Sequence, residues 1–236
     1  MIIAANLKTN LTRSATCKYI KELQICVQNS TQNVIVFPAT SSLDSYESNV
    51  TIGAQNAYPV ENGAFTGEIG LEHLKEFEIK TILIGHSERR HILGESQEFI
   101  AKKFHYFKEQ GFQIIFCVGE PLEIREGSKE EMLTYIHKQF EGIDTTYENL
   151  IIAYEPVWAI GTGKVPTLED IKEIHKELKK KSSAPLLYGG SVKVNNVKDI
   201  LSVENVDGVL VGSAALYAEH FCTMIEYADE LQQSRH

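Results

Sequence analysis

The sequence predicts an α/β fold: a single closed (β/α)8 barrel spanning residues 1–236. Short apolar, β-branched runs recur eight times, and most lack polar alternation, as strands do when both faces of a parallel sheet are buried. A helical or loop-plus-helix segment follows each run. No Pro/Gly/Ser-rich linker divides the chain. Eight strand–helix units in a chain of this length favour a closed barrel.

The apolar runs place the strands in order along the chain. We expect strands at Ile2–Ala5, Val34–Phe37, Thr51–Ala54, Thr81–Ile84, Ile114–Cys117, Leu150–Tyr154, Leu186–Tyr188 and Gly208–Val211. The clearest intervening helices are expected at Thr16–Gln28, Gln97–Gln110, Lys129–Phe140 and Leu168–Lys181. Thr167 is the expected N-cap of the last of these, with Glu169 and Asp170 in its first turn, where carboxylates favour a helix.

A doubly wound open sheet is the structural rival of the barrel. Such a sheet would be expected to carry a glycine-rich fingerprint after its first strand. The segment in that position reads Asn6-Leu7-Lys8-Thr9-Asn10 and contains no glycine. The closed barrel is therefore preferred.

The amino-acid composition restricts which partners and which cellular compartment can be expected for this chain. Thirty-two acidic against 23 basic side chains give a formal net charge of -9, which disfavours nucleic acid or an anionic membrane as a partner. Without a secretory signal or a long apolar run, the chain is expected to be cytoplasmic. The four cysteines show neither CxxC spacing nor a neighbouring His cluster, so we expect reduced thiols, with no metal site and no disulfide framework.

Polar residues follow several of the expected strands. Asn6 and Lys8 come after the first, His86 after the fourth and Glu155 after the sixth. Because barrel enzymes place their active sites at the carboxyl ends of the strands, we expect these side chains to meet at one face.

Each of these groups has both a functional and a structural interpretation. Glu155, stopped by Pro156 and followed by a loop with an apolar tip, suits an acid–base enzyme that excludes water; it could also form a structural ion pair. His86 precedes an expected helix, whose positive end would keep the imidazole neutral; it could also be a core histidine bonded to backbone. Lys8 could bind a phosphate or oxyanion, or simply be a surface lysine.

The turns after the seventh and eighth strands form the usual phosphate-binding corner of such barrels. They read Gly189-Gly190-Ser191 and Gly212-Ser213, and their backbone N–H groups could cradle a phosphate; two ordinary tight turns are the alternative. The segment Gly161-Thr162-Gly163-Lys164 does not fit a nucleotide P-loop, because Trp158 and Val165 stand where that pattern needs Gly and Ser or Thr.

Together these segments resemble one family, triosephosphate isomerase, in the family's order and over nearly the whole chain. The matching segments are Asn6-x-Lys8, Gly53-Ala54-Gln55-Asn56, Gly63-Ala64-Phe65-Thr66-Gly67-Glu68, Gly85-His86-Ser87-Glu88-Arg89-Arg90, Cys117-Val118-Gly119-Glu120, Tyr154 through Lys164, Tyr188-Gly189-Gly190-Ser191-Val192 and Asp207-Gly208-x-Leu210-Val211-Gly212.

The resemblance implies a TIM barrel that interconverts dihydroxyacetone phosphate and glyceraldehyde 3-phosphate through an enediol(ate), in glycolysis and gluconeogenesis, without cofactor or metal. It implies Glu155 as base, neutral His86 as electrophile and proton shuttle, Lys8 as the stabilising charge and Asn6 as an orienting group, a division of roles well known for the family. Pro156–Pro166 would be a lid that excludes water. The implied phosphate-binding N–H groups belong to Gly161, Ser191, Gly212 and Ser213.

The resemblance also implies a homodimer. In this family the loop that carries Thr66 inserts into the neighbouring subunit, and Gln55 is expected at the same interface; a surface Ω-loop is the alternative. Three departures stand out. Leu7 replaces a usual Trp, with an expected effect on packing. Ser213 replaces a usual glycine, where a positive φ would be strained. Pro166 is expected to stiffen the lid.

Two other hypotheses remain open from the sequence. One is a different phosphate-sugar barrel enzyme, which would share the phosphate corner but not the chemistry. The other is a non-catalytic binding protein on a retained barrel, which would be expected to have lost Lys8, His86 or Glu155, and all three are present.

Overall fold

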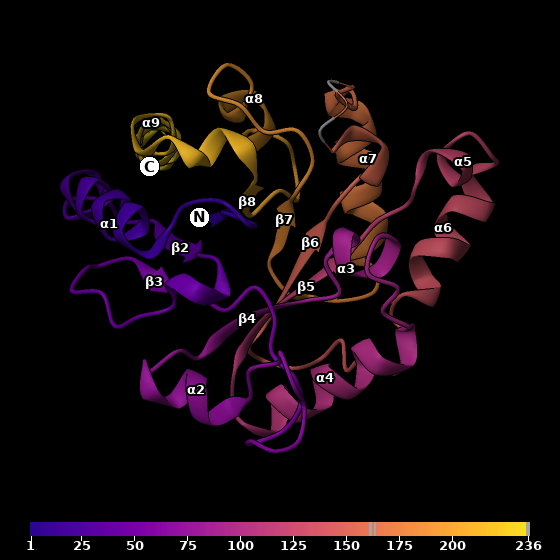
Figure 1. Cartoon of the computed structure of the whole chain (residues 1–236). Helices are drawn as coiled ribbons and strands as arrows, with labels where there is room; N and C mark the ends of the chain where they lie inside the picture. Colours follow the sequence, from indigo (N-terminus) through magenta and orange to yellow (C-terminus); the bar gives the residue numbers. More distant parts are fainter. Residues whose placement is uncertain (161, 163, 235–236) are drawn as a thin grey trace.

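The computed structural model describes residues 1–160, 162 and 164–234. In this part of the chain, eight parallel strands lie side by side in the order β3-β2-β1-β8-β7-β6-β5-β4, with helices around them (Figure 1). The strands are β1 Ile2–Asn6, β2 Asn33–Phe37, β3 Thr51–Ile52, β4 Thr81–Ile84, β5 Gln113–Val118, β6 Leu150–Tyr154, β7 Leu186–Tyr188 and β8 Gly208–Val211. The predicted (β/α)8 barrel is confirmed.

The barrel closes between β3 and β4 through one residue. Gly53 still donates to Val36 of β2, at 2.9 Å. Ala54 then forms an isolated parallel bridge with Ile82, and its N–H donates to the carbonyl of Thr81 at 2.9 Å. The predicted strand at 51–54 is therefore shorter in the structure, because its last residue changes neighbours from β2 to β4.

Helices and short 3-10 turns follow the strands. The α-helices are α1 Arg13–Val27, α2 Leu71–Glu76, α3 Ser87–His91, α4 Gln97–Glu109, α5 Leu122–Arg125, α6 Lys129–Lys138, α7 Leu168–Lys179, α8 Val197–Leu201 and α9 Ala218–Gln233. The 3-10 turns are η1 Thr40–Ser42, η2 Val157–Ala159 and η3 Ser213–Leu216. In the described residues, no helix combines the length and the apolar character that crossing a membrane requires.

Capping side chains decide where two of these helices begin. Thr12 accepts a hydrogen bond from Ala15 N, so α1 begins three residues before the predicted Thr16. Thr167 caps α7 as predicted: its hydroxyl accepts from Asp170 N, and the Asp170 carboxylate accepts from Thr167 N in return. Such reciprocal bonds satisfy N–H groups that a helix start otherwise leaves unpaired.

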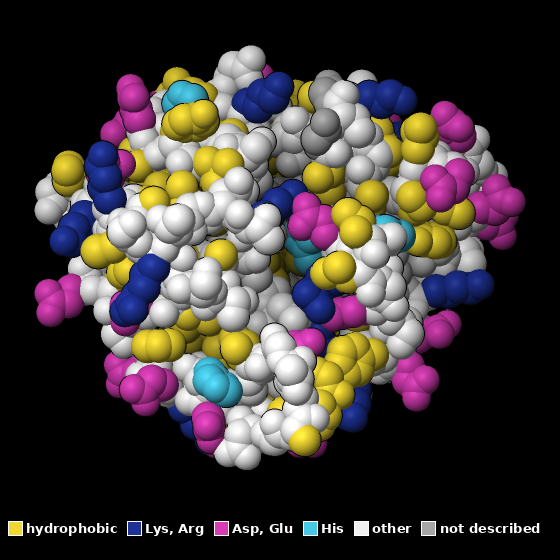
Figure 2. Space-filling view, in the orientation of Figure 1, with side chains coloured by type: hydrophobic (Ala, Val, Ile, Leu, Met, Phe, Trp, Pro, Cys, Tyr) yellow, Lys and Arg dark blue, Asp and Glu magenta, His cyan; other side chains and the backbone are white. Residues whose placement is uncertain are grey.

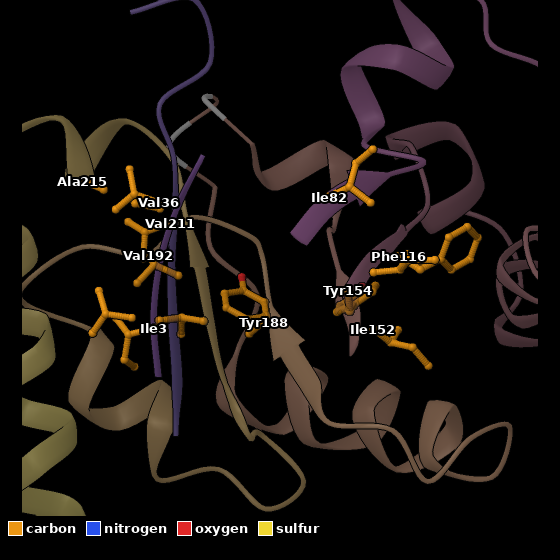
Figure 3. Close-up of a cluster of buried hydrophobic side chains, with 14 of the residues drawn as sticks. Ile3, Val36, Ile82, Phe116, Ile152, Tyr154, Tyr188, Val192, Val211 and Ala215 are labelled. Carbon is orange, nitrogen blue, oxygen red and sulfur yellow. The ribbon is translucent and has the colours of Figure 1, made fainter. Parts of the chain in front are cut away.

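Strand residues alternate between two apolar clusters. Those facing into the barrel are Ala4, Ile35, Phe37, Leu83, Ile115, Cys117, Ile151, Ala153, Leu187 and Leu210. Their neighbours face the helices, among them Ile3, Val36, Ile152, Tyr154 and Tyr188 (Figure 3). Burial on both faces explains why the strands read as unbroken apolar runs. Because Tyr154 points outward, the next residue, Glu155, continues the inward-facing series at the barrel mouth.

The first and last helices, α1 and α9, pack together beside the paired first and last strands, β1 and β8 (Figure 1). A disulfide joins Cys26 of α1 to Cys222 of α9, with 5.7 Å between their Cα atoms. The expectation of reduced thiols is therefore wrong for this pair, whereas Cys17 and Cys117 are free. Residue spacing did not indicate the bond, because the two cysteines are 196 positions apart and their helices meet only beside the paired strands β1 and β8.

Candidate active site

The carboxyl ends of the strands surround a cavity of about 800 Å³. It is lined by seven of the predicted residues: Asn6, Lys8, His86, Glu155, Ser191, Gly212 and Ser213. Figure 2 shows a hollow near the centre of this face, where basic, acidic and histidine side chains gather. The structure therefore brings the predicted catalytic groups and the predicted phosphate corner into one site. Gly161, the remaining predicted phosphate ligand, lies outside the described residues.

Glu155 and His86 are in direct contact at this site. The Nε2 atom of His86 lies 2.8 Å from Oε1 of Glu155, and both side chains are almost fully buried. The other carboxylate oxygen, Oε2, accepts the backbone N–H of Ser87 at 3.1 Å. A carboxylate and an imidazole are thus held together at the mouth of the barrel.

The backbone around His86 defines its tautomer. His86 is the N-cap of α3, and its Nδ1 accepts the N–H of Glu88 at 3.3 Å. An accepting Nδ1 carries no proton, so Nε2 holds the proton and donates it to Glu155. The sequence predicts a neutral ring because the positive end of α3 disfavours the imidazolium, but the carboxylate beside the ring acts in the opposite direction. Burial disfavours the imidazolium, but the charge and hydrogen bond of Glu155, together with the charge of Glu88, outweigh burial and raise the pKa of His86.

The carboxyl group of Glu155 is held in its ionised form. Burial favours the neutral acid, but the charge that His86 carries when protonated, the hydrogen bond of His86 and the N–H of Ser87 outweigh burial, so the pKa of Glu155 is lowered. Gly119 allows the backbone of Glu155 to sit where it does, because a Cβ at position 119 would lie 1.7 Å from the carbonyl oxygen of Glu155. A glycine is therefore required beside the carboxylate.

The backbone of Lys8 is held by the side chains of Asn6 and Gln55. It adopts a left-handed conformation, with φ of 53°. Its N–H donates to Oδ1 of Asn6 at 3.0 Å, and its carbonyl accepts Nε2 of Gln55 at 2.8 Å. The ammonium group pairs with Glu88 at 2.7 Å. A Cβ at Gly212 would lie 3.9 Å from Nζ, so the charge of Lys8 stands beside the phosphate corner.

The phosphate corner accommodates Ser213 without the strain expected from the sequence. Ser213 begins η3. Among the described residues, the non-glycine positions with positive φ are Lys8, Leu11, Glu78 and Asn205. The expected strain is absent, because this residue starts a 3-10 turn rather than a left-handed one. Leu7, the other departure near the site, is fully buried, as a packing role requires.

Glu120 is a buried residue beside the start of the predicted lid, and the sequence analysis assigns it no role. It is fully buried, and its Oε1 accepts both the indole N–H of Trp158 and the hydroxyl of Tyr154, each at 3.0 Å. Burial raises the pKa of Glu120, against the lowering effect of these hydrogen bonds. Trp158 belongs to η2, at the start of the predicted lid. A signal existed, since Glu120 lies two residues after the end of β5, at the same end of the barrel as Glu155.

The two predicted interface residues do not line the cavity of their own chain. Thr66 is exposed in the loop before α2, where Phe65 stacks on Tyr58 with 4.3 Å between ring centroids. Gln55 bonds the carbonyl groups of Lys8 and Phe37. Within the described residues, no group of three or more His, Cys, Asp or Glu side chains is arranged to hold a metal ion.

The chain is similar to known proteins over almost its whole length. Residues 1–228 match the family model described as triosephosphate isomerase. A triosephosphate isomerase of Sulfurimonas denitrificans is 67% identical over 99% of this chain and 98% of its own length. Those of a Sulfurovum species, at 57% over 95% and 99%, and a Nitratiruptor species, at 52% over 98% and 100%, are also similar. The site and these matches agree, and the chain belongs to the triosephosphate isomerase family.

Proposed function

We propose that this protein interconverts dihydroxyacetone phosphate and D-glyceraldehyde 3-phosphate by proton transfer through an enediol(ate). The buried contact of 2.8 Å between His86 and Glu155 carries the proposal, because it joins a base and a proton donor beside a cavity that also holds a cation. The names of the relatives support the same reaction.

A substrate that enters between Glu155 and His86 replaces their hydrogen bond. The carboxylate of Glu155 then takes a proton from the carbon next to the carbonyl and returns it to the neighbouring carbon. The Nε2–H of His86 donates to the carbonyl oxygen and moves protons between the two oxygens. Lys8 stabilises the negative charge of the enediolate, and Asn6 orients the substrate.

The phosphate group of the substrate occupies the corner after β7 and β8. Backbone N–H groups of Ser191, Gly212, Ser213 and Gly161 bind it, and the ammonium of Lys8 adds charge from the side. Binding the phosphate fixes the reacting carbons relative to Glu155. The phosphate group is therefore the part of the substrate that this site recognises.

The segment Pro156–Pro166 acts as a lid over the bound substrate. An enediolate phosphate exposed to water can eliminate its phosphate, so closure protects the intermediate. Ile160 already lines the cavity, and Trp158 is held by Glu120. Pro166 is buried at the other end of the segment, directly before the Thr167 cap, where it restricts the hinge.

We also propose that the enzyme works as a cytoplasmic homodimer joined by the loop around Thr66, with Gln55 near the interface. Exposed apolar side chains support the proposal: Phe65 lies in the Thr66 loop itself, and Ile92 and Leu93 form a consecutive exposed pair after α3. Clustered exposed apolar groups mark interaction surfaces. Sedimentation of a Thr66→Arg variant tests it: we expect a monomer with reduced activity, and a fully active monomer would contradict the role of the loop.

A coupled assay with glyceraldehyde 3-phosphate tests the reaction. We expect wild-type turnover and a loss of roughly 10²–10⁴-fold in kcat for Glu155→Gln, the typical contribution of a positioned base. Glu148→Gln is the matched control, because Glu148 is exposed and lies at the opposite end of β6. No turnover by the folded wild-type protein would refute the reaction, and undiminished turnover by Glu155→Gln would refute the base.

A further inference from the structure

A tyrosine outside the cavity holds the backbone of the phosphate corner. Tyr19 lies on α1 and is 4% exposed. Its hydroxyl donates a hydrogen bond of 2.6 Å to the carbonyl of Ala215, which is 196 positions away in sequence. Burial raises the pKa of Tyr19, so the hydroxyl keeps its proton and remains a donor throughout the neutral range. Tyr19 itself does not line the cavity.

The acceptor of this bond is part of the corner itself. Ala215 lies in η3, which begins at Ser213 directly after Gly212. The N–H of Ala215 donates to the carbonyl of Gly212 at 2.9 Å, and its carbonyl accepts Tyr19. The turn that carries the N–H groups of Gly212 and Ser213 is therefore fixed internally and from α1.

The two helices that support this bond pack against each other. The disulfide between Cys26 and Cys222 ties α1 to α9, and α9 begins at Ala218, two residues after η3 ends. The corner is consequently held from α1 through the Tyr19 hydroxyl and from α9 through the chain. Because hydrogen bonds depend steeply on distance and angle, a small shift of η3 would misdirect both N–H groups.

We propose that Tyr19 is a positioning residue for the phosphate site: its hydrogen bond to Ala215 keeps the N–H groups of Gly212 and Ser213 aimed at the phosphate of the substrate. The inference rests on the proposed assignment of this corner as the phosphate site. It predicts that Tyr19 tunes phosphate affinity, while proton transfer by Glu155 and His86, which Tyr19 does not touch, stays intact.

The test compares two Tyr→Phe variants by kinetics. Tyr19→Phe keeps the buried ring and removes only the hydroxyl. We expect KM, and the inhibition constant of inorganic phosphate as a competitor, to rise by roughly 2- to 10-fold, the range that one lost hydrogen bond gives. We expect kcat to stay within about twofold, because the reacting groups are unchanged.

Tyr147→Phe is the matched control. The hydroxyl of Tyr147 donates to the carbonyl of Phe112 at 2.8 Å, in the segments before β6 and β5, at the end of the barrel opposite the site. The control loses the same kind of bond, so we expect lower thermal stability with unchanged KM and phosphate inhibition.

Each outcome decides for or against the inference. Weaker phosphate inhibition in Tyr19→Phe alone supports it. Equal stability losses in both variants, with phosphate inhibition unchanged in both, overturn it and leave the phosphate corner standing. If inorganic phosphate fails to compete with substrate in the wild type, the assignment of the corner fails, and the inference with it.

Discussion

His175 is a histidine that the fold keeps uncharged. It is fully buried on α7, with its ring 6.0 Å from that of Tyr154 and 6.4 Å from that of Tyr188 between centroids. Its Nδ1 donates to the carbonyl of Asn205 at 2.9 Å. Burial lowers the pKa of His175 to about 4, against the raising effect of that carbonyl.

This low pKa makes stability depend on pH. Below the ordinary imidazole pKa, the unfolded chain takes up a proton that folded His175 refuses until about pH 4. Stability is therefore complete above the ordinary pKa and falls as pH decreases toward 4, by up to ~3 kcal/mol from this group. Urea unfolding at pH 7.5 and pH 5 measures the loss.

His175→Asn separates this group from the others that titrate in the same range. An Asn amide can still donate toward the Asn205 carbonyl but does not titrate, so we expect a smaller decrease in stability between pH 7.5 and pH 5. His105→Asn is the matched control, because His105 is exposed on α4. An equal pH dependence in wild type and His175→Asn would contradict the prediction.

For single residues, the sequence predicts a place in the site only where the position of the residue along the chain, such as directly after a strand, indicates it. Lys8, His86 and Glu155 each follow a strand, so barrel geometry brings them together. Glu120 carries the same signal, but its partner Trp158 is 38 positions away. No sequence signal marks Tyr19. Its acceptor is a backbone carbonyl 196 positions away, and such a contact leaves no local pattern.

Among the elements, the proposed lid contains a residue whose fluorescence can report its movement. Trp158 is the single tryptophan of the chain. Its indole N–H donates to Glu120, and the guanidinium of Arg125 lies 5.4 Å from its ring centroid. Intrinsic fluorescence therefore reports the surroundings of one lid residue.

Binding of a phosphate ester should change this fluorescence. We expect saturating glycerol 3-phosphate, which has no carbonyl to isomerise, to shift the emission of Trp158 as the lid closes and its contacts change. In the free Glu120→Gln variant, which loses the carboxylate charge, we expect emission already displaced toward the ligand-bound value. An emission spectrum that stays constant through saturation would contradict a lid movement that involves Trp158.

The start of α7 followed the sequence because a local side chain sets it, whereas the local cap Thr12, which starts α1, was missed. The Thr167 cap was predictable because its partner Asp170 is three residues away. The end of β3 was not, because the change of neighbour at Ala54 depends on a strand that comes later in the chain. Local signals thus define most elements, and contacts between distant segments adjust their ends.

For the whole molecule, the disulfide is a reversible contribution to stability. Disulfides are rare in a reducing cytoplasm, so the stability that this bond contributes depends on the redox conditions around the protein. We expect reduction to lower Tm by roughly 5–15 °C, given the usual stabilisation by a disulfide and the size of this chain. Calorimetry with and without dithiothreitol measures the shift.

Two serine variants control this experiment. Cys26→Ser should melt at the same temperature with or without reductant, because the pair can no longer form. Cys17→Ser should keep the full difference, because Cys17 is free. If reductant leaves the wild-type Tm unchanged, the disulfide does not stabilise the fold.

The barrel architecture was predictable from the sequence, whereas the disulfide between α1 and α9 was not. Eight apolar runs at regular intervals lead to a closed barrel whatever the details of packing. The helices α1 and α9 lie close together because the first and last strands pair. No short-range pattern in either helix predicts this contact. The proposed dimer depends on a second chain, and the pattern of one chain alone could not reveal it.

The disulfide also changes how the molecule responds to cleavage. Cys26 and Cys222 close most of the polypeptide into a covalent ring, and the lid segment lies within that ring. A protease that cuts the oxidised protein once at the lid opens the ring without releasing a fragment. The two pieces remain one molecule until a reductant separates them, so a nicked barrel can keep both halves of its active site together.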